Sequence, residues 1–265
     1  MSRLVSILIL GASTLPSVAI ASCPTEAISM FAPPGPLPPA PHFVVHHQGD
    51  LMAEDVTTQV ELTSGGDRRV GVRTVHSLLG RLIRQFVVVP ETPLSDGTWV
   101  VVPRKGTAAF RAQNGHPLGE LVVARDASTA APRFVGMPST AGFSETRFGC
   151  GSDAVVRVEE AWMDRSGLVE VTVRGDDFEL VGLTTESSGV IELGVFMCGG
   201  EFDLPRGKTF AIILRPLGAT GLPGDWRVLV ASTPPLPPMP RLGEGFSRPS
   251  LGDLLGGKPL PQRRR

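Results

Sequence analysis

Short runs in which apolar and polar residues alternate constrain the fold of this chain more than any other feature. In LVEVTVR, residues 168–174, three valines occupy one side, and a glutamate, a threonine and an arginine occupy the other. Successive side chains of a β-strand point to opposite faces, so this run predicts a strand with one buried and one solvated face. Further apolar runs at 155–162, 190–197, 209–214 and 226–231 are separated by turn residues. This spacing is typical of antiparallel β-sandwiches and predicts an all-β fold.

Two segments in the first half concern hairpins. Residues 60–63 and 69–74 alternate around Gly65-Gly66, and a glycine pair tolerates the positive φ angles of a tight turn. Residues 75–86 are ambiguous, because their apolar positions follow helical spacing while Gly80 interrupts them. A short helix before a strand and a hairpin both remain open for this segment.

A turn motif occurs once in each half of the chain. PLSDGTW at residues 93–99 and LPRGKTF at residues 204–210 each place a leucine, a glycine and then an aromatic residue before an apolar run. The motif resembles the corner before the penultimate strand of bacterial immunoglobulin-like and fibronectin type III-like domains, which often reads Leu-x-x-Gly-Thr-x-Tyr. This resemblance to uncharacterised exported proteins of Gram-negative bacteria implies two tandem antiparallel β-sandwich (Ig-like) domains and no active site. Because Trp99 or Phe210 stands where the family has tyrosine, the hydrogen bond of a tyrosine hydroxyl is expected to be missing.

Composition places the predicted domain boundaries. The segment 23–40 is rich in proline, which blocks helix interiors and makes a stiff spacer. Residues 233–265 are rich in proline and glycine with little to bury, and we expect them to be disordered. The predicted organisation is a signal peptide at 1–22, a spacer at 23–40, a sandwich at 41–125, a linker at 126–138, a sandwich with a disulfide at 139–232 and a tail at 233–265.

The N-terminus predicts export. Arg3 precedes an interrupted apolar stretch at residues 4–20, which is the layout of a secretory signal and is too broken to span a bilayer stably. A buried N-terminal helix is the alternative. The letters AIA at 19–21 permit cleavage before Ser22, whereas IASC at 20–23 resembles the lipobox of bacterial lipoproteins. The second resemblance implies a diacylated Cys23 as the new N-terminus, with the membrane as a partner through that lipid.

The cysteine count is consistent with this hypothesis. The chain has three cysteines, and lipidation of Cys23 leaves Cys150 and Cys198 as an even pair. An oxidising compartment favours a disulfide between them. We therefore expect an exported protein in the periplasm or at the outer membrane, with free secretion as the alternative.

Composition and motifs disfavour several functions. A net charge of −1 argues against a nucleic-acid partner. His42, His46 and His47 do not converge on a metal if they form a strand, since residues four apart are about 13 Å distant and neighbours diverge; we expect exposed edge positions. The pairs Glu159-Glu160 and Asp176-Asp177 are expected at the solvated surface. There is no G-x-S-x-G motif and no phosphate-binding glycine motif. We therefore expect no catalytic residue, cofactor or metal.

The favoured hypothesis is a non-enzymatic cell-envelope protein with a structural or protein-recognition role and an envelope protein as partner. The alternative is a secreted carbohydrate-binding or hydrolase-accessory module. Trp99, Trp162 and Trp226 bear on this choice, because tryptophans can stack on sugars. Single tryptophans in strands more often belong to the core, and we expect core positions for these three.

Overall fold

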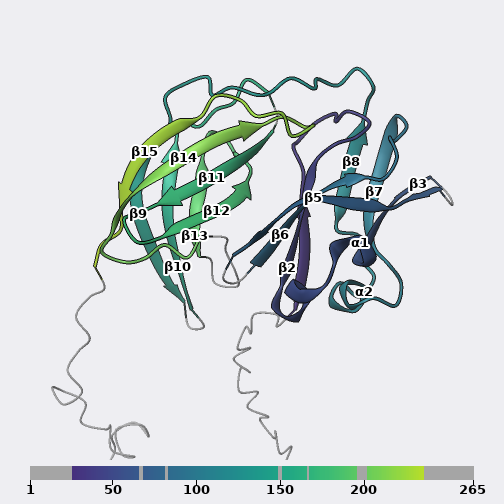
Figure 1. Ribbon diagram of the computed structural model, residues 1–265, viewed down its shortest axis with the longest axis horizontal. Coiled ribbons are helices and arrows are strands. Elements are labelled where there is room, and N and C mark those ends of the chain that lie inside the picture. The colour runs from purple at the N-terminus through teal and green to yellow at the C-terminus, as the bar shows by residue number, and fades with distance from the viewer. Residues whose placement is uncertain are drawn as a thin grey trace, which may run out of the picture. The chain divides into compact units, whose positions relative to one another are not determined.

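The computed structural model describes residues 26–65, 68–80, 83–148, 151–165, 167–195 and 202–235 (Figure 1). This part of the chain is built mostly of β-strands, which form four antiparallel sheets. Its helices are short: a 3-10 helix η1 at Gly49–Ala53 and the α-helices α1 at Val56–Gln59 and α2 at Ala108–Ala112. The predicted all-β fold class is confirmed.

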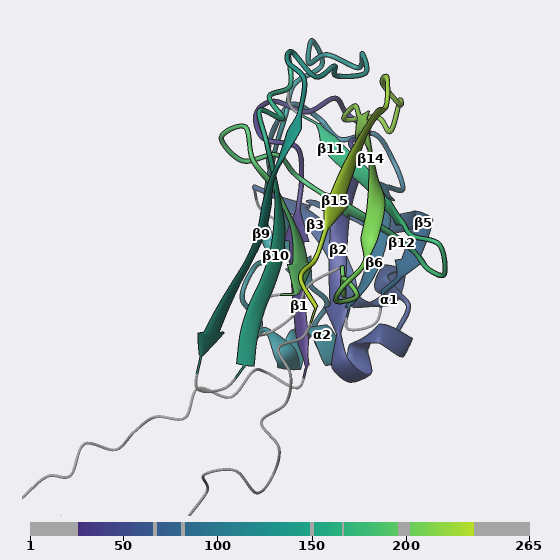
Figure 2. The same ribbon diagram turned by 90° about the vertical axis from the view of Figure 1, so that its left-hand side faces the viewer.

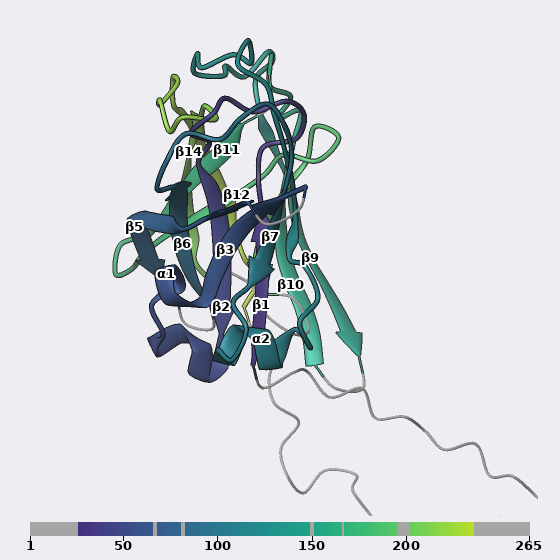
Figure 3. The same ribbon diagram turned by 90° about the vertical axis from the view of Figure 1, so that its right-hand side faces the viewer.

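The first half of the chain forms two sheets. One has the strand order β1-β2-β6-β5 and the other has the order β4-β3-β7-β8. Figure 3 shows β3 and β7 in front of β2 and β1. The strand bounds are β1 Ala27–Phe31, β2 Phe43–Gln48, β3 Val60–Ser64, β4 Arg68–Val70, β5 Val72–Leu79, β6 Ile83–Pro90, β7 Gly97–Pro103 and β8 Gly119–Val123.

The inward side chains of these two sheets share one hydrophobic core. Phe43 and Val88 come from the first sheet, and Leu62 and Trp99 come from the second. Burial of a large apolar side chain contributes roughly 1.5–3 kcal/mol to stability, so these residues fix how the two sheets face each other. A pair of antiparallel sheets around one core is the sandwich arrangement.

The second half forms another pair of sheets. Their strand orders are β13-β10-β9 and β12-β11-β14-β15. Figure 2 shows β9 and β10 in one layer and β11, β14 and β15 in the other. The bounds are β9 Ser139–Phe148, β10 Gly151–Glu159, β11 Leu168–Arg174, β12 Glu179–Thr184, β13 Ile191–Val195, β14 Thr209–Leu217 and β15 Arg227–Ser232. The valines of the run at 168–174 are fully buried in its core, as the alternation predicts.

The ambiguous segment 75–86 belongs to a hairpin of β5 and β6, not to a helix. Only β6 is buried on both faces: Phe86 packs into the first core, whereas Val87 packs on the opposite face with Val44. β5 is an edge strand whose register shifts between Thr74 and His76, and its Val75 and Leu79 are 47% and 74% exposed. The helix-like spacing therefore combines exposed apolar positions of β5 with a strand, β6, that is buried on both faces.

The predicted hairpin at residues 60–74 is correct only in its first part. β3 pairs with β4, with Leu62 opposite Val70. The chain then leaves this sheet at Gly71, and β5 pairs with β6 in the other sheet. A carboxylate oxygen of Glu91 lies 2.4 Å from where a Cβ on Gly71 would stand, so a side chain at this crossing would displace Glu91.

The outer faces of two sheets meet in a third buried cluster. It contains Val44 of β2 and Val87 of β6, together with Leu168 and Leu183 from the second half. The described residues up to Pro234 also group into one compact unit by their contacts. The two sandwiches are therefore in direct apolar contact.

Several predictions concern residues outside the described part of the chain. These are the signal at 1–22, lipidation of Cys23, the disulfide of Cys150 with Cys198 and most of the tail at 233–265. Among the described residues, none of the helices is long and apolar enough to cross a bilayer. The spacer predicted at 23–40 needs correction, because β1 Ala27–Phe31 lies within it, pairs with β2 and buries Ile28 in the first core. The other boundaries of the two sandwich domains stay predictions.

Candidate functional site

A tight turn between β12 and β13 organises the most developed surface site. Ser187 and Val190 exchange two backbone hydrogen bonds of 2.9 and 3.0 Å. Ser188 and Gly189 between them have φ angles of 53° and 77°. Two successive left-handed residues between a bonded pair form a type I′ turn, in which glycine relieves the backbone. The Glu186 carboxylate accepts a hydrogen bond from the Gly189 N–H and closes the turn.

A pocket of about 630 Å³ lies on one side of this turn. We call it the junction pocket, because both halves of the chain contribute to its wall. Its polar and aromatic lining comes from β1 and β2, from β10 and β13, and from the turn: Phe31, His46, Arg157, Glu192, Thr185 and Ser187. A volume of this size is typical of small-molecule sites.

A cross-strand ion pair forms one wall of the junction pocket. Arg157 of β10 stands directly opposite Glu192 of β13. The Arg157 Nε and Nη2 atoms donate to the Oε1 atom of Glu192 at 2.9 and 2.8 Å. Within the described part of the chain, the second carboxylate oxygen and Nη1 have no hydrogen-bond partner. The pair therefore leaves one donor and one acceptor and carries no net charge.

A buried glutamine joins the two sandwiches behind the pocket. The Gln85 Nε2 atom of β6 donates to the backbone carbonyl of Leu183 in β12 at 2.7 Å. The Leu183 N–H donates to the Gln85 Oε1 atom, also at 2.7 Å. Gln85 is 2% exposed, so both bonds are shielded from water. We call this pair of bonds the Gln85 clamp. It satisfies two backbone groups of β12 that would be costly to bury unpaired.

The Gln85 clamp fixes the protonation state of His46. Because Leu183 determines which end of the Gln85 amide carries nitrogen, the second Nε2 hydrogen points to the His46 Nε2 atom at 2.9 Å. That imidazole nitrogen must accept, so the ring is neutral and carries its proton on Nδ1. Burial lowers the pKa of His46 to about 4, and the neighbouring His47 adds to the effect. The Phe31 ring packs edge to face against the His46 imidazole, with 4.9 Å between the two ring centroids.

Trp162 forms a second feature next to the same turn. A hollow of about 300 Å³ is lined by Pro34, Trp162, Arg165 and Glu186, and we call it the Trp162 shelf. Trp162 is 54% exposed. Its ring packs against Gly189, where an added Cβ would lie 2.4 Å from the indole. The turn therefore holds the indole in place on the protein surface.

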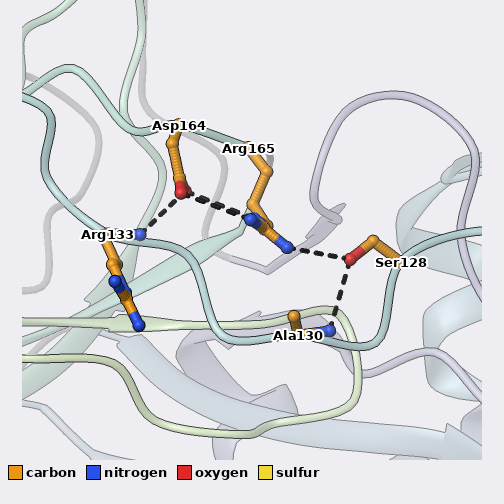
Figure 4. Close-up of polar contacts among 5 residues, drawn as sticks. All are labelled: Ser128, Ala130, Arg133, Asp164 and Arg165. Carbon is orange, nitrogen blue, oxygen red and sulfur yellow. Dashed lines mark hydrogen bonds and ion pairs between the residues drawn. The ribbon is translucent and has the colours of Figure 1, made fainter.

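A polar network fixes the segment that carries Trp162 (Figure 4). The Asp164 carboxylate accepts from the Arg133 backbone N–H at 2.9 Å and from the Arg165 Nε atom at 3.3 Å. The Arg165 Nη1 atom donates to the Ser128 hydroxyl at 3.1 Å. The Arg133 N–H lowers the pKa of Asp164, and Arg165 lowers it further. The network ties residues 162–165 to residues 128–133.

The histidine prediction is wrong about exposure. His42, His46 and His47 do not occupy an exposed edge, because β2 lies between β1 and β6. His47 is fully buried, and its Nδ1 atom lies 2.8 Å from the Leu51 carbonyl. His46 and His47 are strand neighbours and face opposite sides of the sheet. In the described residues there is no group of three or more histidine, cysteine or acidic side chains placed to hold a metal.

The tryptophan prediction is correct for one residue of three. Trp99 is 1% exposed, whereas Trp162 and Trp226 are 54% and 63% exposed. Trp162 follows the end of β10, and Trp226 precedes β15. In place of the tyrosine hydroxyl bond, the Trp99 Nε1 atom donates to the Ser95 carbonyl at 2.9 Å, a bond that the sequence interpretation did not include. The indole N–H thus reaches a backbone carbonyl close to the corner.

The paired carboxylates are exposed as predicted. Glu159 ends β10 and Glu160 follows it, while Asp176 and Asp177 occupy the turn after β11. The Lys208 Nζ atom lies 3.0 Å from Asp177. Sequence reasoning missed the junction pocket, because its residues come from five separate segments and form no linear motif.

Comparisons with known proteins assign no family. No family model matches the chain, and no curated protein matches it. Among solved structures, a pullulanase type I from Bacillus subtilis str. 168 complexed with maltose is similar over 78% of this chain and 25% of that one, with 12% identity and a TM-score of 0.26.

Two other solved structures are similar at the same level. A pullulanase from Anoxybacillus sp. LM18-11 matches over 76% of this chain and 25% of that one, with 12% identity and a TM-score of 0.25. The S-layer protein rSbsC(31-844) matches over 78% of this chain and 41% of that one, with 10% identity and a TM-score of 0.24. The chain thus spans less than half of each of these proteins, and scores this low assign no function.

Proposed function

We propose that this chain is an exported, non-enzymatic protein of the cell envelope that recognises a protein partner through β15. One observation carries the proposal. Trp226, Val228 and Val230 are exposed to 63%, 48% and 66%. They alternate with other residues at every second position, so their side chains point to the same face of the edge strand β15. Trp226 stands directly before the first residue of this strand. We call these three residues the β15 patch.

The β15 patch is unusual because its strand is apolar on both faces. Leu229 and Ala231 pack into the second core from the inner face. Edge strands with a solvated outer face usually carry polar or charged residues there. The register places Ile213 beside Val228, so the apolar surface extends onto β14. Exposed apolar patches that include tryptophan are typical of protein interfaces.

Photo-crosslinking in cells tests protein recognition by the patch. A photoreactive phenylalanine at Val228 is expected to give an adduct with a different protein. Val122 of β8 is the matched control, because its exposure is also 48% and it lies in the other sandwich. Equal adducts at both positions, adducts with a second copy of this chain alone, or no adduct at Val228 would each argue against this role.

Export and anchoring are part of the same proposal and rest on the sequence. A lipid on Cys23 would anchor the chain only four residues before β1, which begins at Ala27. Replacing Cys23→Ala should then move the protein from the membrane fraction to the soluble periplasmic fraction. A mature chain that begins at an unmodified Ser22 would rule out the anchor and leave export intact.

The disulfide of Cys150 with Cys198 is also proposed. It is supported by the strands that flank it, because β10 begins at Gly151, β13 ends at Val195, and these strands are paired. Closing a loop of about 49 residues stabilises a fold by roughly 4 kcal/mol in the chain-entropy model. Thiol titration of the denatured, unreduced protein should find neither of these two thiols free.

A second candidate function is carbohydrate binding, and the exposure of Trp162 favours it. An indole beside Arg165 and Glu186 offers a stacking face with polar groups at its edge. Purified peptidoglycan sacculi, starch and cellulose are suitable probes for a pull-down. Replacing Trp162→Ala should abolish retention, whereas Trp226→Ala, at a tryptophan that is also exposed, serves as the control. Retention that survives Trp162→Ala would eliminate the shelf as the site.

A further inference from the structure

We propose that the junction pocket binds a small neutral ligand rich in hydroxyl groups, of the class of mono- and disaccharides. This inference is independent of protein recognition by the β15 patch. It also concerns a different surface from the Trp162 shelf, since the two hollows share no lining residue. The pocket's dimensions, charge balance and hydrogen-bonding groups carry it.

The dimensions and walls fit a small polar molecule. The volume of about 630 Å³ lies in the range of small-molecule sites. One aromatic ring, that of Phe31, contributes an apolar surface on which a C–H face can pack. Thr185 and Ser187, in and just before the turn, contribute hydroxyl-bearing side chains to the lining. Predominantly apolar ligands would leave these groups without partners.

The charge balance of the pocket favours a neutral ligand. Arg157 and Glu192 neutralise each other through two short hydrogen bonds. His46 carries no charge while its Nε2 atom accepts from Gln85. An anionic or cationic ligand would therefore meet no unpaired opposite charge in the wall. It would lose its hydration without compensation.

The hydrogen-bonding groups favour hydroxyls in particular. The ion pair leaves the second oxygen of Glu192 as an acceptor and Nη1 of Arg157 as a donor. A hydroxyl group both donates and accepts, so a ligand with several hydroxyls can pair with acceptors and donors alike. Sites with placed polar groups strongly reject analogues that lack the matching groups.

The pocket is preformed, which lowers the entropic cost of binding. The strand register holds Arg157 opposite Glu192, and the type I′ turn holds Ser187. The Gln85 clamp holds the His46 ring from behind. Groups that are already ordered lose little conformational freedom when a ligand binds.

Calorimetry and saturation-transfer NMR with the full chain test the proposal. The probes are glucose, N-acetylglucosamine, trehalose and maltose at millimolar concentrations. At least one is expected to bind, and Glu192→Ala should weaken binding roughly tenfold or more. Glu179→Ala is the matched control, because Glu179 forms the same kind of cross-strand pair with Arg174 on another sheet. Circular dichroism and thermal unfolding confirm that each variant is folded.

Three results would overturn the inference. The first is no binding by any of the four saccharides. The second is binding that Glu192→Ala leaves unchanged, including binding lost only in Trp162→Ala, which would place the sugar on the Trp162 shelf. The third is saturable binding of a charged peptide that competes with the saccharides for the pocket. The crosslinking experiment at Val228 does not depend on any of these outcomes.

Discussion

At the scale of single residues, the polar atoms of buried aromatic rings determine more than their apolar surface does. Trp99 places its Nε1–H on the Ser95 carbonyl, so it replaces the hydroxyl bond expected of tyrosine at this corner. His46 accepts from Gln85 and thereby stays neutral. In both cases one hydrogen bond fixes the orientation of a ring and, for His46, its protonation.

The corner bond of Trp99 leads to a first prediction. Trp99→Phe keeps an aromatic ring but leaves the Ser95 carbonyl without its partner and opens space in the core. We expect a loss of about 2 kcal/mol in the free energy of unfolding, measured by urea denaturation. Trp226→Phe at the surface is the control and should change it by less than about 0.5 kcal/mol. Equal effects of the two changes would contradict the assignment.

His46 leads to a prediction about pH. Its pKa of about 4 in the folded protein lies below the ordinary value of 6.5, so the unfolded chain binds more protons between these pH values. The free energy of unfolding therefore falls as the pH falls through this window. His46→Gln can still accept from Gln85, through its Oε1 atom, and should remove part of this dependence, on the order of 3 kcal/mol.

Residual pH dependence is expected in His46→Gln, because burial also lowers the pKa of His42 and of His47. Replacing the exposed His116→Gln controls for the loss of any histidine. Urea denaturation at several values between pH 7 and pH 4 makes the measurement. A profile for His46→Gln that coincides with that of the unchanged protein would refute this role of His46.

At the scale of elements, tight turns and double-sided sheets explain where sequence reasoning succeeded and failed. Period-two runs such as 168–174 identified strands correctly, because one face is buried and the other solvated. The run 75–86 was ambiguous because β5 carries exposed apolar residues beside a register shift, whereas β6 is buried on both faces. Partner strands were harder to predict: β4 and β5 are separated by Gly71 alone and yet belong to different sheets.

The candidate sites were less predictable than the fold. Trp162 and Trp226 flank strands, and the apolar pattern does not distinguish a residue just outside a strand from one inside it. The pair Arg157 and Glu192 depends on the register of β10 with β13, which local sequence does not encode. Gln85 and Leu183 are 98 residues apart in the sequence, and the residue pattern of neither segment predicts their contact.

The turn at 187–190 supports a prediction with a matched control. Gly189→Ala introduces a methyl group at a φ of 77° and directly against the Trp162 ring. Gly106→Ala has a similar φ of 87° with nothing within 4 Å, so it reports the backbone strain alone. We expect Gly189→Ala to cost about 1 kcal/mol more than Gly106→Ala and to red-shift tryptophan fluorescence. Identical costs and unchanged fluorescence would show that the turn does not support the indole.

At the scale of the whole molecule, the two sandwiches are coupled by a small buried contact. Val44, Val87, Leu168 and Leu183 supply the apolar part, and the Gln85 clamp supplies the polar part. Such a contact makes the two cores unfold together, because separating them exposes both the cluster and two unpaired backbone groups.

This coupling gives the last prediction. Gln85→Ala leaves the backbone N–H and C=O of Leu183 buried without partners and should cost about 2–4 kcal/mol. Calorimetry should then resolve two transitions in place of one. Ser77→Ala, an exposed change on the neighbouring strand β5, is the control. A single transition at the original midpoint would show that the clamp does not couple the sandwiches.

The apolar cluster between the sandwiches has a practical consequence for anyone who divides the gene. A fragment ending near residue 125 would present Val44 and Val87 to water, and the complementary fragment would present Leu168 and Leu183. We expect each fragment alone to aggregate through its exposed apolar surface. When both fragments are expressed together, the two apolar surfaces can bury each other. We therefore expect the two fragments, produced separately and then mixed, to form a soluble heterodimer through this apolar cluster.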